Sequence, residues 1–371
     1  MKRREIGPEL MRVVATVMVI TLHILGRGGI IYNADRTGLL YWVAWFLEIA
    51  AYGAVNCFAL ISGYVMFRRP VKVSNLVSLW LQACFYSVLI TGLFYLFRPG
   101  MVGLKDLVLS AFPVFTWQYW YVSAYFALFF LMPFLNLIVD RAPKQTLHKL
   151  FLALGLGVGI IDCILPGEPF FIADGYSTVW LAVMYLVGAY IKKYTIAERI
   201  SPKKCMAVAV GLFLLTLLSK FAISFLTELI LGKAKGDNMF MRYSSLPVAV
   251  SAVCLFLCCL RAKVGKIGTK IVNLLAPTAL GVYLIHVHPC IYNGILAESF
   301  AFLIDWPVVL MVLAVAAAMI GIFLVCAVVE WARMGLFRVL RVKAFAQFVD
   351  RKTNALLRKI FETEKIPAEE K

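Results

Sequence analysis

Charged side chains are scarce in this sequence. Asp, Glu, Lys and Arg together make up 15% of its 371 residues, whereas a soluble domain carries about a quarter charged residues. Hydrophobic residues make up 62%, and apolar runs near twenty residues, long enough to cross a hydrocarbon core of roughly 30 Å, recur along the chain. This composition excludes a soluble globular protein and predicts an all-α, polytopic integral membrane protein.

The common signatures of cofactor and metal sites are also missing. The chain has no glycine-rich phosphate loop, no Rossmann fingerprint and no zinc-ligand spacing. Of its nine cysteines only Cys205 lies at the edge of an apolar run, so small buried side chains are expected rather than disulfides. The cluster of Cys254, Cys258 and Cys259 lacks a CxxC pair and an accompanying histidine or carboxylate. We therefore expect no metal site there.

The positive charge is large but it is not gathered on one face or in one domain. The formal net charge of +17 comes from lysines and arginines in alternate loops, which is the pattern of the positive-inside rule and argues against nucleic-acid binding. The loops predicted inside contain Arg68, Arg69 and Lys72; Arg141, Lys144 and Lys149; Lys192, Lys193, Arg199, Lys203 and Lys204; and Arg261, Lys263, Lys266 and Lys270.

The hydrophobic runs predict about ten transmembrane helices. We place them at about 10–32, 41–67, 75–97, 118–139, 150–166, 176–191, 205–229, 245–260, 274–294 and 306–332. An even number puts both termini on one side, and the basic start Lys2, Arg3 and Arg4 predicts that this side is the cytoplasm. The expected location is the cell (cytoplasmic) membrane, in which the protein is multi-pass.

Two segments are not counted as spans. Gly103–Thr116 is short and predicts an outer loop or a shallow re-entrant segment. The tail over 336–371 alternates apolar and basic residues at helical spacing. Two interpretations of this tail stay open: a helix lying on the anionic inner leaflet, with membrane lipids as its partner, or an ordinary solvated amphipathic helix.

The first span carries the most unusual set of polar residues. Arg12 and His23 are eleven residues apart, which on a helix brings them to within roughly 20° of one face and separates them by about 16 Å along the axis. Glu9 and Thr16 fall close to the same face, and Glu9 can also pair with Arg12 at i,i+3. Ionisable residues inside a span are costly, so this stripe must face protein or water. Arg12 alone could be a snorkelling anchor, and His23 could be a satisfied interhelical contact, but their alignment favours a chemical role.

Three more ionisable residues lie near the ends of late spans. His286 and His288 are two residues apart, so they point to different sides of a helix and form a poor metal pair. We expect one to face the interior and the other the interface. Glu330 is expected to be a buried carboxylate that partners a cytoplasmic-side arginine, with an interfacial position at the helix end as the alternative.

Several of these segments together resemble the membrane acyltransferase-3 family, which includes bacterial O-acetyltransferases of surface polysaccharides. The first span, Glu9-Leu-Met-Arg12 followed by ten residues and His23, is similar to the arginine-to-histidine motif that opens the family. The fragments that follow in the family's order are Asn56-Cys-Phe-Ala-Leu-Ile-Ser62-Gly63-Tyr64, Trp117-Gln-Tyr-Trp120-Tyr-Val-Ser-Ala-Tyr125, Tyr283-Leu-Ile-His286 and Glu330. Three positions depart from the family pattern: Glu9 stands where an aspartate is usual, Arg69-Pro-Val-Lys72 where R-x-x-R is frequent, and Trp331 where proline is frequent.

The resemblance implies an acyltransferase-3-like transmembrane domain over 1–335, of the stand-alone type. It implies transfer of an acyl group, usually acetyl, from acyl-CoA to a hydroxyl of a glycan or an undecaprenyl-linked sugar. The donor is acetyl-CoA as a substrate, and no cofactor is expected to stay bound. The residues that the match assigns to catalysis are Glu9, Arg12 and His23; those that it assigns to substrate or donor binding are Ser62, Arg68, Arg69, Lys72, Trp120, Tyr125, His286 and Glu330. His23 would act as general base or as a nucleophile that carries the acyl group, and sequence leaves both open.

A secondary transporter of a small polar or anionic substrate is the alternative from another class. Buried histidines and arginines would suit a substrate or proton path equally well. The sequence shows no internal repeat and no pair of Gly/Pro-broken helices, which are typical of carriers, so it favours the transferase.

Overall fold

The protein is an all-helical bundle. The computed structural model describes residues 5–165, 170 and 172–361, and every regular element within these residues is a helix, which confirms the predicted class. The longer helices are α1 (Ile6–Leu25), α3 (Leu39–Ala51), α4 (Ala54–Met66), α5 (Val73–Phe97), α7 (Trp120–Arg141), α8 (Lys144–Leu156), α10 (Thr178–Lys193), α12 (Pro202–Leu231), α13 (Leu246–Arg261), α14 (Lys266–Leu275), α15 (Ala279–His286), α17 (Val308–Val339) and α18 (Val342–Phe361). The short helices are α2 (Ile30–Asn33), α6 (Leu104–Leu109), α9 (Asp162–Ile164), α11 (Ile196–Arg199) and α16 (Pro289–Ile291).

Eight segments of the described chain are long and apolar enough to cross a membrane. They are Ile6–Asn33, Leu39–Met66, Val73–Phe97, Trp120–Arg141, Lys144–Ile164, Pro202–Leu231, Lys266–His286 and Val308–Val339. The other two expected spans are α10 and α13, which have 16 residues each. At 1.5 Å per residue such a helix is about 24 Å long, less than the roughly 30 Å of a hydrocarbon core. The count of ten therefore stays a prediction.

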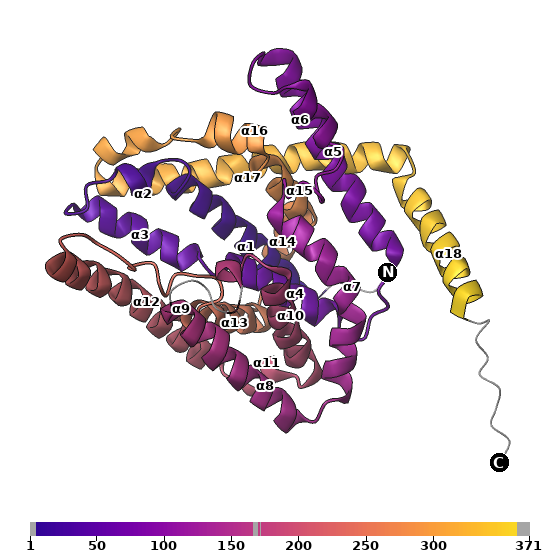
Figure 1. Ribbon diagram of the computed structural model, residues 1–371, viewed down its shortest axis with the longest axis horizontal. Helices are drawn as coiled ribbons and strands as arrows, with labels where there is room; N and C mark the ends of the chain where they lie inside the picture. Colours follow the sequence, from indigo (N-terminus) through magenta and orange to yellow (C-terminus); the bar gives the residue numbers. More distant parts are fainter. Residues whose placement is uncertain (1–4, 166–169, 171, 362–371) are drawn as a thin grey trace.

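The two ends of the described bundle can be followed in Figure 1. Helix α1 begins at the same end at which α17 finishes and α18 turns away, whereas α2 and the loop between α12 and α13 lie at the opposite end. The placement of this end in the cytoplasm stays a prediction, because its basic markers Lys2, Arg3 and Arg4 lie outside the described residues. The stretch from Gly103 to Thr116 holds only α6 and turns, as expected for a segment that does not span.

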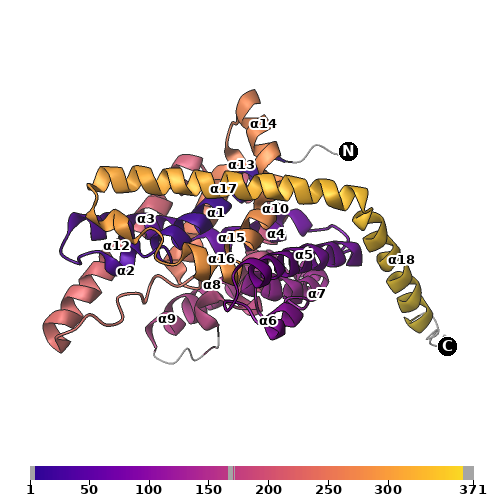
Figure 2. The same ribbon diagram turned by 90° about the horizontal axis from the view of Figure 1, so that it is seen from above.

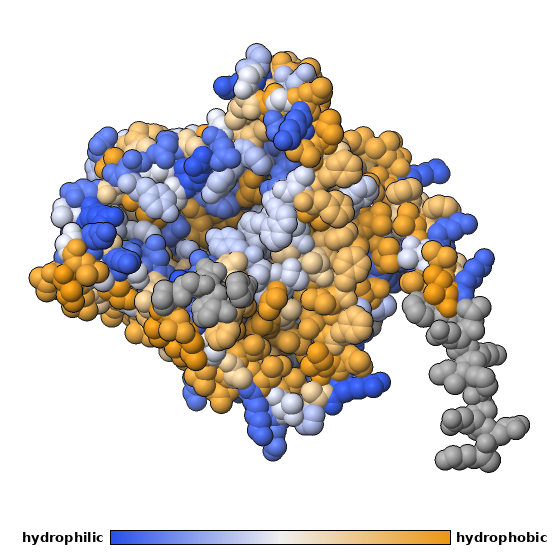
Figure 3. Space-filling model, viewed as in Figure 1, coloured by the Kyte–Doolittle hydropathy of each residue, from blue (hydrophilic) through white to orange (hydrophobic). Residues whose placement is uncertain are grey.

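The helices divide into a buried centre and an exposed periphery. In the most apolar window of Ile6–Asn33, the segment that holds α1 and α2, 72% of the residues are buried, but in that of α12 only 11% are. Helix α17 lies along the outside of the bundle over its whole length (Figure 2). Large apolar side chains such as Phe225 and Leu229 on α12 and Val309 and Val328 on α17 are exposed. Figure 3 shows such apolar surface over much of one face, as a protein solvated by lipid requires.

Two of the spanning segments are locally irregular. The second has a turn at Tyr52 and Gly53 between α3 and α4, and the seventh changes to a 3₁₀ turn at Ala276–Thr278, which contains Pro277, between α14 and α15. Tyr52 and Gly53 keep right-handed helical backbone angles, as do Leu275 and Ala279 on either side of the 3₁₀ turn, so both segments stay continuous spans with a local irregularity. Proline removes a backbone donor and glycine weakens a helix, which accounts for these irregularities.

Helices α4 and α10 touch at the level of their backbones. A Cβ atom added to Gly63 would collide with the carbonyl group of Tyr185, and one added to Gly188 would collide with the carbonyl group of Leu60. Each helix thus has a glycine where the other's backbone approaches, the arrangement that small residues allow between membrane helices. This contact fixes α4, which carries part of the cavity described next.

Candidate active site

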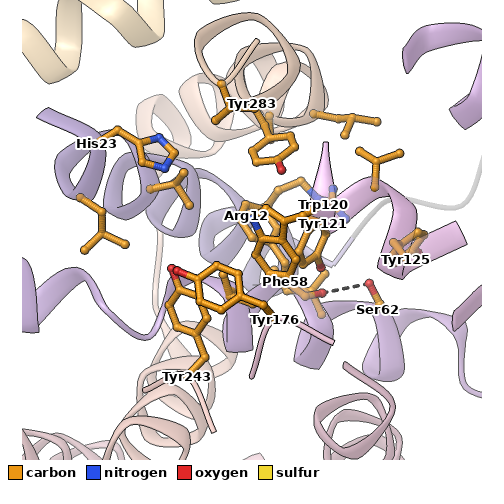
Figure 4. A pocket seen from close by; sticks show the side chains of 18 of the residues that line it. Arg12, His23, Phe58, Ser62, Trp120, Tyr121, Tyr125, Tyr176, Tyr243 and Tyr283 are labelled. Carbon is orange, nitrogen blue, oxygen red and sulfur yellow. Dashed lines mark hydrogen bonds between the residues drawn. The ribbon is translucent and has the colours of Figure 1, made fainter. Parts of the chain in front are cut away.

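A cavity of about 470 Å³ lies between α1, α4, α7 and α15. Its walls are mostly apolar and aromatic with a few polar groups, the usual composition of a small-molecule site. Figure 4 shows Arg12 and His23 on α1 together with the aromatic side chains around them. The polar and aromatic residues that line the cavity are Arg12, His23, Phe58, Ser62, Gln118, Trp120, Tyr121, Tyr125, Tyr176, Tyr243, Tyr283 and Tyr292.

The polar stripe of α1 faces this cavity at two levels. Arg12 and His23 both line it, as the helical spacing predicts. The guanidinium of Arg12 donates to Oε2 of the buried Glu9 at 2.6 Å, and the Thr16 hydroxyl donates to the carbonyl of Arg12 at 2.8 Å. Glu9 is therefore confirmed as the i,i+3 partner of Arg12, and it does not itself line the cavity. The helix places a guanidinium and an imidazole on one wall.

His23 is held by a second histidine from α15. Its Nδ1 lies 3.0 Å from Nε2 of His286, and Nδ1 of His286 lies 2.6 Å from the carbonyl oxygen of Val282. A carbonyl can only accept, so His286 carries its proton on Nδ1, and a neutral His286 accepts at Nε2. His23 then donates from Nδ1, and its own Nε2 keeps a free lone pair. These two hydrogen bonds determine which ring nitrogen of His23 carries the proton.

His288 is buried as well, which corrects the expectation that one of the two late histidines faces the interface. Only 1% of His288 is exposed. Its Nδ1 accepts from the backbone N–H of Cys290 at 3.2 Å, and its Nε2 lies near Thr91 Oγ1 (3.2 Å) and the Ser87 carbonyl (3.3 Å). His286 and His288 point to different sides of their segment, as predicted. Helix α5 covers the side to which His288 points, so both histidines are inside the bundle.

Gln118 joins His288 to the cavity. The amide nitrogen of Gln118 lies 2.9 Å from Nε2 of His288, and its amide oxygen accepts from the hydroxyl of Ser87 at 2.7 Å. The residue is on the cavity wall. It follows Trp117, whose φ of 56° is the left-handed conformation that non-glycine residues rarely adopt. Gln118 lies within the fragment Trp117–Tyr125 that resembles the family, but it was assigned no role, because an uncharged residue before a helix carries no signal without its partners.

The rest of the cavity is dominated by aromatic rings. Trp120 and Tyr125, which the family resemblance selected, line it as expected. Trp120 packs against Tyr176 (ring centroids 4.6 Å apart) and stacks on Tyr243 (interplanar angle 14°). The buried side chain of Asn56 accepts from the Trp180 indole and donates to the Tyr243 carbonyl, which secures this wall. Tyr176 and Tyr243 come from loops, so no helical periodicity could have found them.

Ser62 also lies on the cavity wall. Its hydroxyl donates to the carbonyl of Phe58 at 2.9 Å, within α4, and the oxygen keeps its capacity to accept. The predicted role of Ser62 in substrate or donor binding stays a prediction.

Glu330 lies outside the cavity and forms a closed cluster. This carboxylate is 1% exposed, and its oxygens accept from Gln82 (3.1 Å), Tyr86 (2.6 Å) and twice from Arg333 (2.9 and 2.6 Å). Its side chain also lies against Gly281 of α15. The buried carboxylate with an arginine partner is confirmed. These contacts hold α17 against α5 and α15. Glu330 is not among the residues that line the cavity.

The basic loop before α5 is also separate from the cavity. Arg68, Arg69 and Lys72 are not among its lining residues. Arg68 is exposed and donates from Nε to Asp140 at 2.9 Å, and Lys72 directly precedes α5. The structure thus brings together Arg12, His23, His286, Ser62, Trp120 and Tyr125, and leaves these three basic residues and Glu330 apart.

Comparison with known proteins adds one result. The family model described as "Acyltransferase domain", that of the acyltransferase-3 family, matches residues 5–331. Searches of curated proteins and of solved structures found no match.

Proposed function

Because the chain belongs to the acyltransferase-3 family, we propose that it moves an acetyl group from acetyl-CoA to a hydroxyl of a surface polysaccharide or of an undecaprenyl-linked sugar. Family membership and the eight apolar helices make it a multi-pass membrane acyltransferase. The donor, the acetyl group, the acceptor and the cytoplasmic membrane as location belong to the proposal.

The observation that carries the proposal is the hydrogen-bond chain from Val282 through His286 to His23. It leaves the Nε2 lone pair of His23 as the basic site on the cavity wall. Acyl transfer to an alcohol needs a base for the hydroxyl proton or a nucleophile that carries the acyl group, and an imidazole with its other nitrogen fixed by a partner can do either. His286 orients His23 in both versions.

The extent of the cavity also suits two substrates that approach from opposite sides. Arg12 lies about 16 Å along α1 from His23, towards the end where the chain begins. On the predicted topology, Arg12 faces the cytoplasmic donor and the loop residues Tyr176 and Tyr243 face the acceptor side. Flat rings with hydroxyl groups can cover the apolar faces of a sugar and bond its hydroxyls, so the aromatic wall supports a glycan acceptor.

We further propose that Arg68, Arg69 and Lys72 receive the phosphates of the donor outside the cavity. Arginine and lysine form charge-assisted hydrogen bonds with phosphate, and an exposed loop can reach a nucleotide that does not enter the membrane. Arg12, paired with Glu9, would meet the donor nearer the thioester. No observation favours the transporter alternative, and the family match does not support it.

The test uses inside-out membrane vesicles that contain the protein, with radiolabelled acetyl-CoA added outside and the native glycans and lipids as acceptors. We expect label in the glycan or glycolipid fraction as base-labile ester. His23→Ala should bring this label down to the level of vesicles without the protein, while His148→Ala, at an exposed histidine outside the cavity, should not. Absence of ester label with wild-type protein would refute the proposal, and intact donor accumulating inside the vesicles would favour transport.

The same vesicles separate the two roles of His23. An acetyl adduct on His23 after incubation with donor alone indicates the nucleophile, and full activity without any adduct indicates the general base.

A further inference from the structure

We propose that Gln118 supplies the hydrogen bond that stabilises the oxyanion of the acyl-transfer intermediate, and that His288 positions it. This inference rests on the proposed acyl transfer and gives a role to two residues to which neither the spacing on α1 nor the family resemblance assigned one. Transfer to a hydroxyl passes through a tetrahedral species whose oxygen carries negative charge. A preorganised N–H donor beside that oxygen is a large source of rate enhancement.

The protonation of His288 follows from its neighbours. Its Nδ1 accepts from the Cys290 backbone N–H at 3.2 Å, so the proton of the neutral ring is on Nε2. The Nε2–H is then surrounded by groups that can accept, the Ser87 carbonyl at 3.3 Å and the Thr91 hydroxyl at 3.2 Å. Gln118 is the third and nearest neighbour of this nitrogen, at 2.9 Å.

The orientation of the Gln118 amide follows in turn. The amide nitrogen of Gln118 stands 2.9 Å from His288 Nε2, and the amide oxygen stands 2.7 Å from Ser87 Oγ. With the His288 proton on Nε2, two N–H groups would oppose each other, so we assign the amide the reverse orientation, with its oxygen towards His288 and its NH₂ group towards Ser87 Oγ. An NH₂ group has two hydrogens, and Ser87 occupies one. The second has no partner among the described residues, and Gln118 is partly exposed to the cavity that His23 lines. The amide is thus anchored at both ends with one donor left for a ligand.

The same short segment therefore holds both groups. His286 fixes the ring of His23 from one side of the segment, and His288 fixes the amide of Gln118 from the other. Because the two histidines are two residues apart, they point to different sides, so one can hold His23 and the other Gln118. The left-handed backbone of Trp117 is a further sign that the position of Gln118 is constrained.

The step balances without any other reactant. The acceptor oxygen bonds to the thioester carbon as its proton passes to His23 Nε2, and the carbonyl oxygen becomes an oxyanion that accepts the free N–H of Gln118. When the oxyanion collapses, the carbon–sulfur bond breaks, and the CoA thiolate takes the proton from His23. If His23 carries the acyl group instead, the same oxyanion forms in each half of the reaction.

Gln118→Glu is the sharpest test, because it keeps both anchors. A carboxylate can accept from His288 Nε2–H and from the Ser87 hydroxyl, but it presents no N–H to the cavity. In the vesicle assay with radiolabelled acetyl-CoA we expect kcat to fall about 100- to 1,000-fold, with the KM for acetyl-CoA within about threefold of wild type. Gln118→Ala should reproduce the loss of kcat without a new charge. Gln347→Glu, the same change on the exposed part of α18, is the matched control.

His288 is tested as a positioning residue by partial rescue. His288→Ala frees the Gln118 amide and should lower kcat, whereas His288→Gln can place an N–H near the former Nε2 and should restore at least about a tenth of the wild-type kcat. Combining His288→Ala with Gln118→Ala should cost little more than Gln118→Ala alone. Both Gln118 variants within threefold of the wild-type kcat, or a loss confined to KM, would overturn the inference. Failure of the proposed function would look different, since the wild type itself would then form no ester.

Discussion

The cluster around Glu330 and the wall around His23 are both polar groups within membrane-spanning helices, but they differ in how many of their hydrogen-bonding sites are filled. Four donor contacts occupy the two oxygens of Glu330. His23, which lines the cavity, uses one ring nitrogen for His286, and its other ring nitrogen has no hydrogen-bond partner among the described residues. Burial of an ionisable residue in a membrane protein is therefore an incomplete sign of function. The filled cluster holds helices together, and the unfilled site is available to a substrate.

The largest effect is expected at the unfilled site. His23→Gln keeps most of the side-chain volume and some hydrogen-bonding capacity but cannot titrate. Acetyl transfer should therefore fall by about a hundred- to ten-thousand-fold, while the protein inserts and accumulates normally. The measurement is ester formation in vesicles per molecule of folded protein, with His148→Gln as control. Near-normal transfer by His23→Gln would show that His23 is not the base or nucleophile. His286 would then be the next candidate.

The filled cluster should show the opposite behaviour. Glu330→Ala leaves the guanidinium of Arg333 buried without its carboxylate, and breaking such a pair costs about 3–5 kcal/mol of stability. We expect little protein in the membrane and a lower melting temperature in detergent, but normal turnover in the molecules that remain folded. Glu228→Ala, at an exposed carboxylate of α12, should change neither quantity. A stable Glu330→Ala protein with no activity would instead place Glu330 in the catalytic machinery.

A smaller effect is expected where positive charges lie outside the cavity. Neutralising Arg69 and Lys72 together should weaken acetyl-CoA binding at least about tenfold, since each charge-assisted hydrogen bond to a phosphate contributes roughly 1.5–3 kcal/mol. Equilibrium binding of labelled acetyl-CoA to the purified protein measures this, and neutralising Lys263 and Lys266 in another basic loop controls for net charge. Unchanged donor affinity in a correctly inserted variant would mean that these residues only set topology.

The smallest effect is expected for an exposed ion pair. The side chains of Arg68 and Asp140 are 66% and 43% exposed, so water and salt screen their attraction. Asp140→Ala should therefore change thermal stability by less than about 1 kcal/mol. A loss as large as that of Glu330→Ala would show that filled hydrogen-bonding sites matter at the surface as much as in the bundle.

The sequence predicted what a single helix determines. The alignment of Arg12 and His23 on one face of α1 follows from helical periodicity, and the pairs Glu9–Arg12 and Glu330–Arg333 are three residues apart. The all-helical class follows from composition. These features need no knowledge of how distant helices pack.

What the sequence could not supply depends on packing. His23 and His286 are 263 positions apart, and their contact exists only because α1 and α15 lie side by side. The burial of His288, the anchoring of Gln118 and the approach of Tyr176 and Tyr243 from loops have the same origin. Apolar runs did show that two of the ten predicted spans, at 176–191 and 245–260, are short, and α10 and α13 have 16 residues each. Hydropathy alone does not decide whether such a short helix crosses the membrane.

The interlocked glycines of α4 and α10 limit how this protein can open. Two helices whose backbones meet at Gly63 and Gly188 cannot slide along each other without first separating, so this side of the molecule behaves as a stiff frame. Ser62 and Phe58 are mounted on that frame. Substrates as large as a nucleotide thioester and a sugar still need a way in. Helices α5 and α7 meet over far fewer residues than α4 and α10 do, so we expect the movement that admits these substrates at the contact between α5 and α7.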